Sequence, residues 1–82
     1  MDWKRFVPAT FEYDWDRDKL GEHRIEFDEA VETFFNPYVV RRNKKFRDRY
    51  QLIGRTDAGR KLKIIFQLKP NKIVRIITGW EL

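Results

Sequence analysis

Apolar residues between Phe27 and Phe35 recur at helical spacing. They follow the i, i+3, i+4, i+7, i+8 pattern of a helix that lies with one face on a core: Phe27, Ala30, Val31, Phe34 and Phe35. Asn36 and Pro37 come directly afterwards and are typical of a helix end. The pattern therefore predicts an amphipathic helix over residues 27–35.

After Pro37 the apolar residues alternate with polar ones, which is typical of strands. This alternation predicts strands at 38–42, 48–56, 61–68 and 72–80, separated by a basic loop at 43–47 and by short turns at 57–60 and 69–71. Because turns this short join antiparallel neighbours, we expect an antiparallel sheet.

The first part of the chain predicts less regular structure. Residues 1–10 are expected to form an irregular arm, residues 11–13 a short strand, and an acidic helix capped by Asp14 or Asp16 is expected to end near Gly21. The expected fold class is therefore α+β, with two short N-terminal helices packed on one face of an antiparallel sheet of three to four strands. We expect a single domain over residues 1–82.

Strand alternation also assigns side chains to the two faces of the sheet. The face toward the helices is expected to hold Tyr50, Leu52, Leu62, Ile64, Phe66, Leu68, Val74, Ile76 and Trp80. The opposite face, here called the open face, is expected to be basic and interrupted by Ile53, Ile65, Ile73 and Ile77. Either long Lys and Arg stems cover these isoleucines or another chain does, and we favour a partner.

Composition excludes several classes of site. Among 82 residues there is no cysteine and one histidine, so a disulfide frame, a thiolate zinc site and a multi-histidine metal site are not expected. We expect no cofactor and no metal. No apolar run approaches the roughly 18 residues of a membrane span, and no signal-peptide pattern follows the N-terminus. We therefore expect a cytoplasmic protein that does not bind a membrane.

Charge is sorted along the chain. Residues 12–32 contain nine acidic and three basic residues, a net charge of −6, whereas residues 38–75 contain thirteen basic and two acidic residues, a net charge of +11. If the two halves form different layers of one domain, one face is positive and suits a polyanion. A basic surface that is merely solvated is the alternative.

Several segments together resemble the BrnT family of bacterial toxins. They are FEYDWDRDK at 11–19, EHRIEFDEAVETFFNP at 22–37, DRYQLIGRT at 48–56, KLKIIFQL at 61–68 and KIVRIIT at 72–78. The family reads roughly as Trp-Asp, Lys-His-Gly, Phe-Glu-Glu-Ala, Phe-Asp-Pro, Glu-Arg-Tyr, Ile-Gly and Ile-Arg-Ile-Ile-Ser-Ala-Arg. The order and spacing of these pieces carry the resemblance.

The resemblance implies a metal-independent ribonuclease toxin of a type II toxin–antitoxin module. It implies a RelE-like fold, cleavage of single-stranded RNA, and neutralisation by a ribbon-helix-helix antitoxin. By resemblance, His23 matches the family's His, Arg49 and Tyr50 match its Arg-Tyr, and Arg75 matches the Arg of its last strand. A homodimer or a toxin–antitoxin hetero-oligomer would then be the assembled form.

The chemistry of these residue types fits that expectation. Guanidinium groups hold two phosphate oxygens at once, and alternation places Arg49 and Arg75 on the open face. Histidine readily exchanges protons near neutral pH, so His23 is the acid–base candidate, with a structural role at a helix junction as the alternative. RNA-binding candidates are Arg41, Arg42, Lys44, Lys45, Phe46, Arg47, Arg55, Lys61 and Lys63.

Two other functions remain open. Thr78-Gly79-Trp80 stands where the family has Ser-Ala-Arg, so a basic residue expected near the active face is replaced. This replacement favours a catalytically degenerate module that binds RNA or a protein without cutting. The four open-face isoleucines Ile53, Ile65, Ile73 and Ile77 are the partner-binding candidates, and they equally suit an assembly protein that dimerises through this face.

Overall fold

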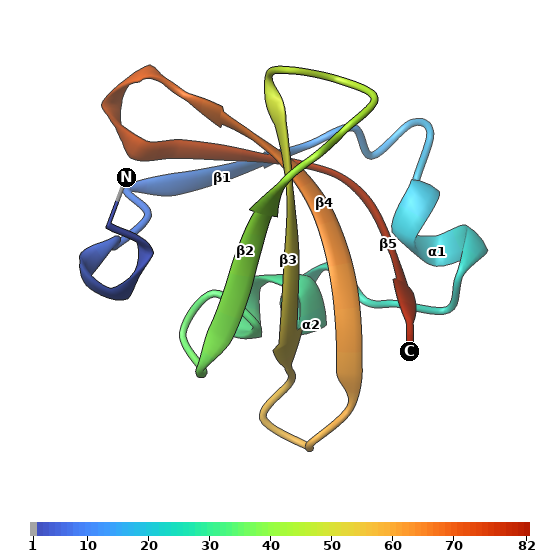
Figure 1. The fold of residues 1–82 in the computed structure, drawn as a ribbon. Helices are drawn as coiled ribbons and strands as arrows, with labels where there is room; N and C mark the ends of the chain where they lie inside the picture. The colour runs from blue at the N-terminus through green and yellow to red at the C-terminus, as the bar shows by residue number, and fades with distance from the viewer. Residues whose placement is uncertain (1) are drawn as a thin grey trace.

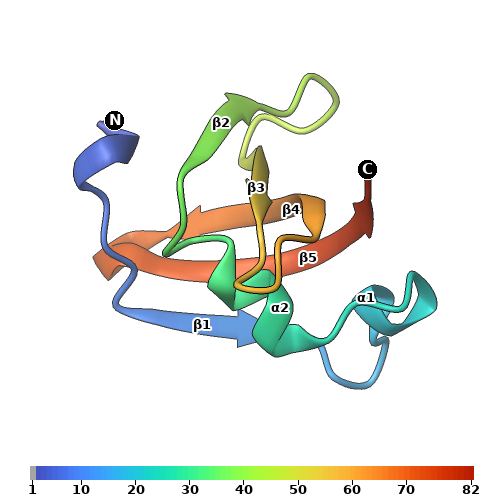
Figure 2. The same ribbon diagram turned by 90° about the horizontal axis from the view of Figure 1, so that it is seen from below.

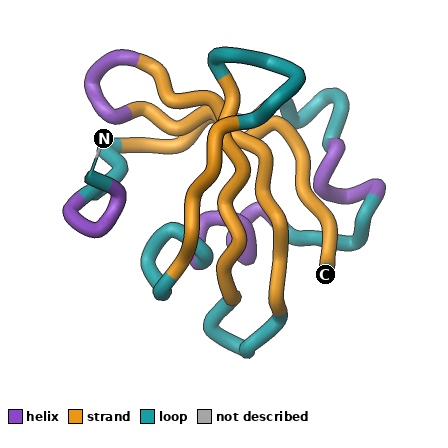
Figure 3. Tube along the Cα trace, in the orientation of Figure 1, coloured by secondary structure: helices purple, strands orange, loops and turns teal. Residues whose placement is uncertain are grey.

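The computed structural model describes residues 2–82, and strands are its main regular secondary structure (Figures 1 and 3). The five strands are β1 (Thr10–Tyr13), β2 (Tyr38–Arg42), β3 (Arg49–Arg55), β4 (Lys61–Lys69) and β5 (Ile73–Glu81). The helices are short: α1 (Lys19–Glu22), α2 (Phe27–Glu32) and two 3-10 turns at Trp3–Arg5 and Pro70–Lys72.

All five strands form one mixed sheet in the order β1-β5-β4-β3-β2. The pairs from β2 to β5 are antiparallel, whereas β1 pairs with β5 in parallel. The expected RelE-like arrangement of two helices on three to four antiparallel strands is therefore wrong. Alternation within a short strand such as β1 predicts its two faces but not its neighbour, so the parallel pairing was not foreseen.

The hydrophobic core lies between the helices and one face of this twisted sheet. Leu20 of α1 and Ala30 of α2 pack with Leu52, Ile64 and Phe66 of the central strands, and all five are fully buried. Figure 2 shows β1 alongside β5, with α1 near the C-terminal part of β5. The helix layer thus covers the face that alternation assigned to the core.

The second helix is shorter than its apolar stripe predicts. The hydroxyl of Thr33 donates to Ala30 O at 2.6 Å, and the amides of Phe34 and Phe35 donate to carbonyls three residues earlier. These i−3 bonds tighten the last turn and end α2 at Glu32. Phe34 still enters the core, but Phe35 turns outward and is 62% exposed.

The first helix begins later than expected. Its N-cap is Asp18, not Asp14 or Asp16, and Asp18 has a left-handed backbone with φ of 41°. The Asp18 carboxylate accepts a hydrogen bond from Gly21 N at 3.2 Å. The capping interaction therefore leaves residues 14–18 as a loop between β1 and α1.

A bulge in β5 changes which residues share a face. Ile65 pairs with Thr78 but Phe66 pairs with Ile76, so Ile77 is an extra residue in the ladder. Beyond the bulge Gly79 faces the core, where an added Cβ would stand 2.7 Å from Ile64 Cδ1. Trp80 consequently lies on the open face opposite Lys63, and the expectation that it faces the core is wrong.

The N-terminal arm is more ordered than expected. Phe6 is buried, and the Trp3 ring makes edge contacts with Tyr50 and Phe66, at centroid distances of 5.2 and 5.7 Å. The arm therefore closes one end of the core. Across residues 2–82, no helix has the length and apolar character needed to cross a membrane.

Phe34→Ala should destabilise the protein by about 3 to 5 kcal/mol, because it empties a buried site between Phe11 and Phe66. Phe35→Ala, one residue away but largely exposed, is the matched control and should change the free energy of unfolding by less than about 1 kcal/mol. Urea unfolding of both variants measures the difference. Equal losses would mean that Phe34 is not the core anchor.

Candidate functional site

One row of polar side chains crosses four strands on the open face. Arg49 of β3 pairs with Gln67 of β4, Gln67 pairs with Arg75 of β5, and Arg75 pairs with Glu12 of β1. Neighbouring strands lie about 4.8 Å apart, so the Arg49 and Arg75 backbones are about 10 Å apart across Gln67. Both guanidinium groups can therefore reach one anion between them.

A cavity of about 210 Å³ lies over this row and the β1–α1 loop. Arg49, Gln67 and Arg75 form its sheet side together with Ile76 and Ile77 at the bulge. The loop contributes Asp14 and Arg17, and the first residue of α1, Lys19, completes the lining. Four cations and one carboxylate thus line what we call the cationic cavity, and its electrostatic potential favours an anion.

The carboxylate of Glu12 closes the β1 end of the row. Glu12 Oε1 is 2.8 Å from Lys69 Nζ and 3.7 Å from an Arg75 guanidinium nitrogen. The hydrogen bond from Lys69 lowers the pKa of Glu12, and the nearby Arg75 charge lowers it further. Glu12 therefore stays ionised and competes with an incoming anion for Arg75.

The other lining groups are also held by local contacts. Asp14 Oδ2 lies 3.5 Å from Arg17 Nε, and Gln67 donates its amide to Asp48 Oδ2 at 2.8 Å. The Arg49 guanidinium stacks 4.2 Å from the centre of the Phe46 ring. The 43–48 loop is thereby fixed to the rim of the cationic cavity.

The basic run at 41–47 does not form one surface. Arg41 pairs with Gln51 on the open face, whereas Arg42 lies on the other face over the Tyr50 ring, at 5.4 Å. Lys44, Lys45 and Arg47 are exposed in the loop. Phe46 is 41% exposed, but Arg49 already covers one of its faces, which limits its use as a stacking platform for a base.

His23 lies away from the cationic cavity. It caps the C-terminal end of α1, is exposed, and its ring centre is 6.1 Å from that of Trp80. Trp80 in turn contacts Lys63, whose Nζ is 5.6 Å from the indole centre. The structure therefore brings Arg49 and Arg75 together but places the third catalytic candidate elsewhere.

The remaining basic candidates lie toward the far end of the open face. Arg55 donates to Gly59 O at 3.1 Å within the β3–β4 turn, and Lys61 is its cross-strand neighbour. Arg55 is six residues from Arg49 along β3, which corresponds to about 20 Å. These two residues therefore cannot contact the same phosphate as the cationic cavity.

The isoleucines of the open face are less exposed than their alternation suggests. Ile65 is 7% exposed within this single chain, and Ile53, Ile73 and Ile77 are half-buried. The open face by itself is thus no bare apolar patch, and partner binding through it stays a prediction.

Sequence reasoning missed the loop contribution to the cavity. Arg17 and Lys19 stand in an acid-rich stretch whose pattern predicts a helix, and nothing in that pattern links them to the sheet. Glu12 alternates with Phe11 and Tyr13 and has the parity of the open face. To place Glu12 opposite Arg75, one must know that β1 pairs with β5, and alternation does not reveal which strand is the neighbour.

The cationic cavity suits a tetrahedral oxyanion such as a phosphate group of an extended polymer. Guanidinium groups bind phosphate oxygens in pairs, and Lys19 adds a point charge from the start of α1. Asp14 is the carboxylate in the lining and is able to accept a proton from a bound hydroxyl. The cavity therefore combines anion binding with one group for proton transfer.

Tyr13 holds the loop of the cavity in place. Its hydroxyl donates to Asp18 Oδ1 at 2.7 Å and accepts from Leu20 N at 2.8 Å. Burial, followed by the hydrogen bond to Asp18, raises the pKa of Tyr13 to about 12. The neutral phenol is thus the form that stabilises the fold.

Tyr13→Phe should lower the free energy of unfolding by about 1 to 2 kcal/mol near neutral pH, because both hydrogen bonds are lost. A raised pKa gives stabilisation that is complete below the ordinary value of 10 and is lost as pH rises through about 12. The gap between wild type and variant should therefore shrink across that window. Urea unfolding at several alkaline pH values tests this, and a constant gap would contradict it.

Comparison of the chain with protein-family models and with curated protein sequences finds no match to either.

Proposed function

We propose that the cationic cavity binds a backbone phosphate of single-stranded RNA, and that this chain is a cytoplasmic, metal-independent ribonuclease toxin. The observation that carries the proposal is the convergence of Arg17, Lys19, Arg49 and Arg75 on one cavity. The resemblance to BrnT supports it, because Arg49 and Arg75 are the residues that match the family's arginines.

In the proposed reaction the 2′-hydroxyl next to the bound phosphate attacks the phosphorus, and the bond from phosphorus to the 5′-oxygen breaks. The products are a 2′,3′-cyclic phosphate and a 5′-hydroxyl, whose oxygen takes its proton from solvent. Arg49 and Arg75 hold the phosphate oxygens and stabilise the charge that develops on them in the transition state. Asp14 accepts the hydroxyl proton, since it lines the same cavity while His23 lies beside Trp80. The exposed loop cations Lys44 and Lys45 bind flanking phosphates.

The proposed partner is a ribbon-helix-helix antitoxin, as the resemblance to BrnT implies. Neutralisation would require the antitoxin to cover the cationic cavity or to occupy it with an acidic side chain. A toxin–antitoxin hetero-oligomer is then the resting form of the protein.

A binding module without catalysis is the second candidate. It is favoured by Trp80, which stands on the open face where the family pattern has a basic residue. It is also favoured by His23, which does not line the cationic cavity. In this case the cavity would hold RNA, and cleavage would be absent.

Arg75→Ala should lower the rate of RNA cleavage by on the order of 100-fold, comparable to the loss of one charge-stabilising donor, while most of the binding is retained. Removing both Lys44 and Lys45 should instead leave the chemical step intact and flatten the log–log salt dependence of binding by about 1.4. Single-turnover cleavage and fluorescence anisotropy with a short oligoribonucleotide separate these effects. Binding without any cleavage by antitoxin-free protein would favour the binding module.

Glu12→Gln should raise the affinity of the cavity for the oligoribonucleotide by about two- to fivefold, because Arg75 loses its competing carboxylate. Glu22→Gln is the matched control, since it makes the same change of charge on an exposed residue of α1. Anisotropy titrations at constant salt measure both. If the two variants gain equally, net charge alone explains the effect and Glu12 does not compete for Arg75.

A further inference from the structure

The outer edge of β2 is unpaired within residues 2–82. β2 is the last strand of the sheet and pairs only with β3. Asn43 N donates to Arg49 O at 2.9 Å, and in an antiparallel ladder this bond fixes the alternation that follows. The backbone groups of Val39 and Arg41 therefore face β3, and those of Tyr38, Val40 and Arg42 face outward.

The first part of this edge carries no protection against strand addition. Tyr38, Val39 and Val40 are uncharged, and the register with β3 is regular. Arg41 and Arg42 oppose the addition of a basic strand but not of an acidic one. Val39 is 58% exposed on the open-face side of the edge. An added strand would thus find three residues with outward backbone groups and an apolar contact.

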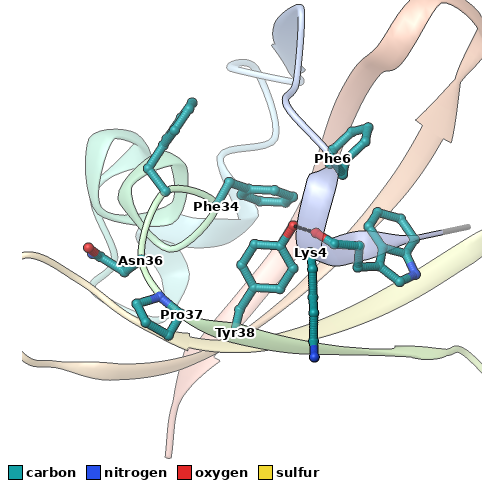
Figure 4. Close-up of a pocket in the computed structure, with 8 residues that line it drawn as sticks. Lys4, Phe6, Phe34, Asn36, Pro37 and Tyr38 are labelled. Carbon is teal, nitrogen blue, oxygen red and sulfur yellow. Dashed lines mark hydrogen bonds between the residues drawn. The ribbon is translucent and has the colours of Figure 1, made fainter.

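A second cavity, of about 410 Å³, opens beside the first residue of β2. We call it the aromatic cavity; its walls include Phe6, Phe34, Phe35, Pro37 and Tyr38 (Figure 4). The hydroxyl of Tyr38 donates to Trp3 O at 2.8 Å and holds the N-terminal arm as the opposite wall. Because Phe35 is 62% exposed, a large apolar side chain would bury aromatic surface here.

The edge strand and the loop that follows it are basic. Residues 33–47 contain five basic residues and no acidic one. Lys4 lines the aromatic cavity at one end of β2, and Arg41 and Arg42 are exposed at the other end. Acidic side chains on both sides of an apolar anchor would complement this distribution.

We propose that the edge of β2 and the aromatic cavity form one docking site for an acidic, extended segment of a partner protein. The segment adds as a sixth strand and places one large apolar side chain in the cavity. Main-chain hydrogen bonds supply affinity and the cavity supplies specificity, as in other strand-addition complexes. This site is separate from the cationic cavity and does not depend on the proposed ribonuclease function.

Two other occupants fit the site less well. A second copy carries the same net charge of +5 and the same arginines at its edge, so two copies repel each other where an acidic segment is attracted. Single-stranded RNA offers no alternating N–H and C=O groups to match the edge, and the aromatic cavity presents apolar walls. An acidic peptide can form the main-chain hydrogen bonds of the edge, fill the aromatic cavity with an apolar side chain and neutralise the basic charge.

The probe is a fluorescein-labelled peptide that alternates glutamate with valine and carries one phenylalanine. Two versions are N-methylated at alternate amides, so that each blocks one edge of the peptide strand. Fluorescence anisotropy should show binding of the parent peptide and a loss of at least about tenfold for one methylated version only. Equal binding of both versions, or no binding of the parent at about 1 mM, overturns the proposal.

Protein variants locate the peptide on the chain. Lys4→Glu and Arg41→Glu should each weaken binding by about threefold or more, whereas the matched control Lys72→Glu, exposed in the connection between β4 and β5, should stay within about twofold. Replacing the peptide phenylalanine by alanine should weaken binding to wild type more than binding to Phe35→Ala, because the two rings share one cavity. Equal effects in both proteins would contradict docking in the cavity.

Sedimentation and competition distinguish the other occupants. A wild-type dimer that Arg41→Glu converts to monomer would assign the edge to a second copy and overturn the proposal. An oligoribonucleotide that displaces the peptide and loses affinity on Lys4→Glu would assign it to nucleic acid, with the same consequence. A monomer that binds the peptide and keeps it in the presence of RNA supports the proposal.

Discussion

The parallel pairing of β1 with β5 is the constraint on which the rest of the structure depends. It sets Glu12 opposite Arg75 and starts the β1–α1 loop at the edge of the open face. That loop places Arg17 at the cationic cavity, and α1, which begins there with Lys19, follows along the part of β5 that β1 leaves uncovered. A β1 paired elsewhere would leave Arg49 and Arg75 on a flat basic sheet, without the loop that turns this surface into a cavity.

Local pattern predicted the strands of this fold but not how the ladder is arranged. The alternation of Leu62, Ile64 and Phe66 and the short turns gave β3, β4 and β5 and their antiparallel order. The bulge at Ile77 has no comparable signal, because an extra residue in a strand appears in the sequence only as one more apolar position. Because the bulge reverses the alternation after Ile77, Trp80 lies on the open face, whereas strict alternation places it on the core face. The end of α2 is likewise missing from the pattern. The apolar stripe continues to Phe35, but i−3 hydrogen bonds that begin at Thr33 end the helix earlier.

The candidate site also contains residues that alternation could place and residues that it could not. Arg49 and Arg75 could be placed on one face from parity, and the structure aligns them across Gln67. Their neighbours from residues 12–19 could not be placed, because a contact between the first strand and the last depends on the whole chain. His23 was assigned by residue type and by resemblance, and neither carries information on distance from the sheet. The aromatic cavity likewise depends on Tyr38 holding the N-terminal arm, a contact across 35 residues.

The polar row drawn from β1, β3, β4 and β5 has a thermodynamic consequence. Glu12, Arg49, Gln67 and Arg75 come together only in the folded state, so an anion that needs this geometry binds the native chain and not the unfolded one. Such a ligand stabilises the fold by mass action, by about 2.7 kcal/mol at a concentration 100 times its Kd. It also relieves the mutual repulsion of the cations that line the empty cavity. In a domain of 82 residues the stability margin is small, so binding of an anion in the cationic cavity and folding of the chain are thermodynamically coupled.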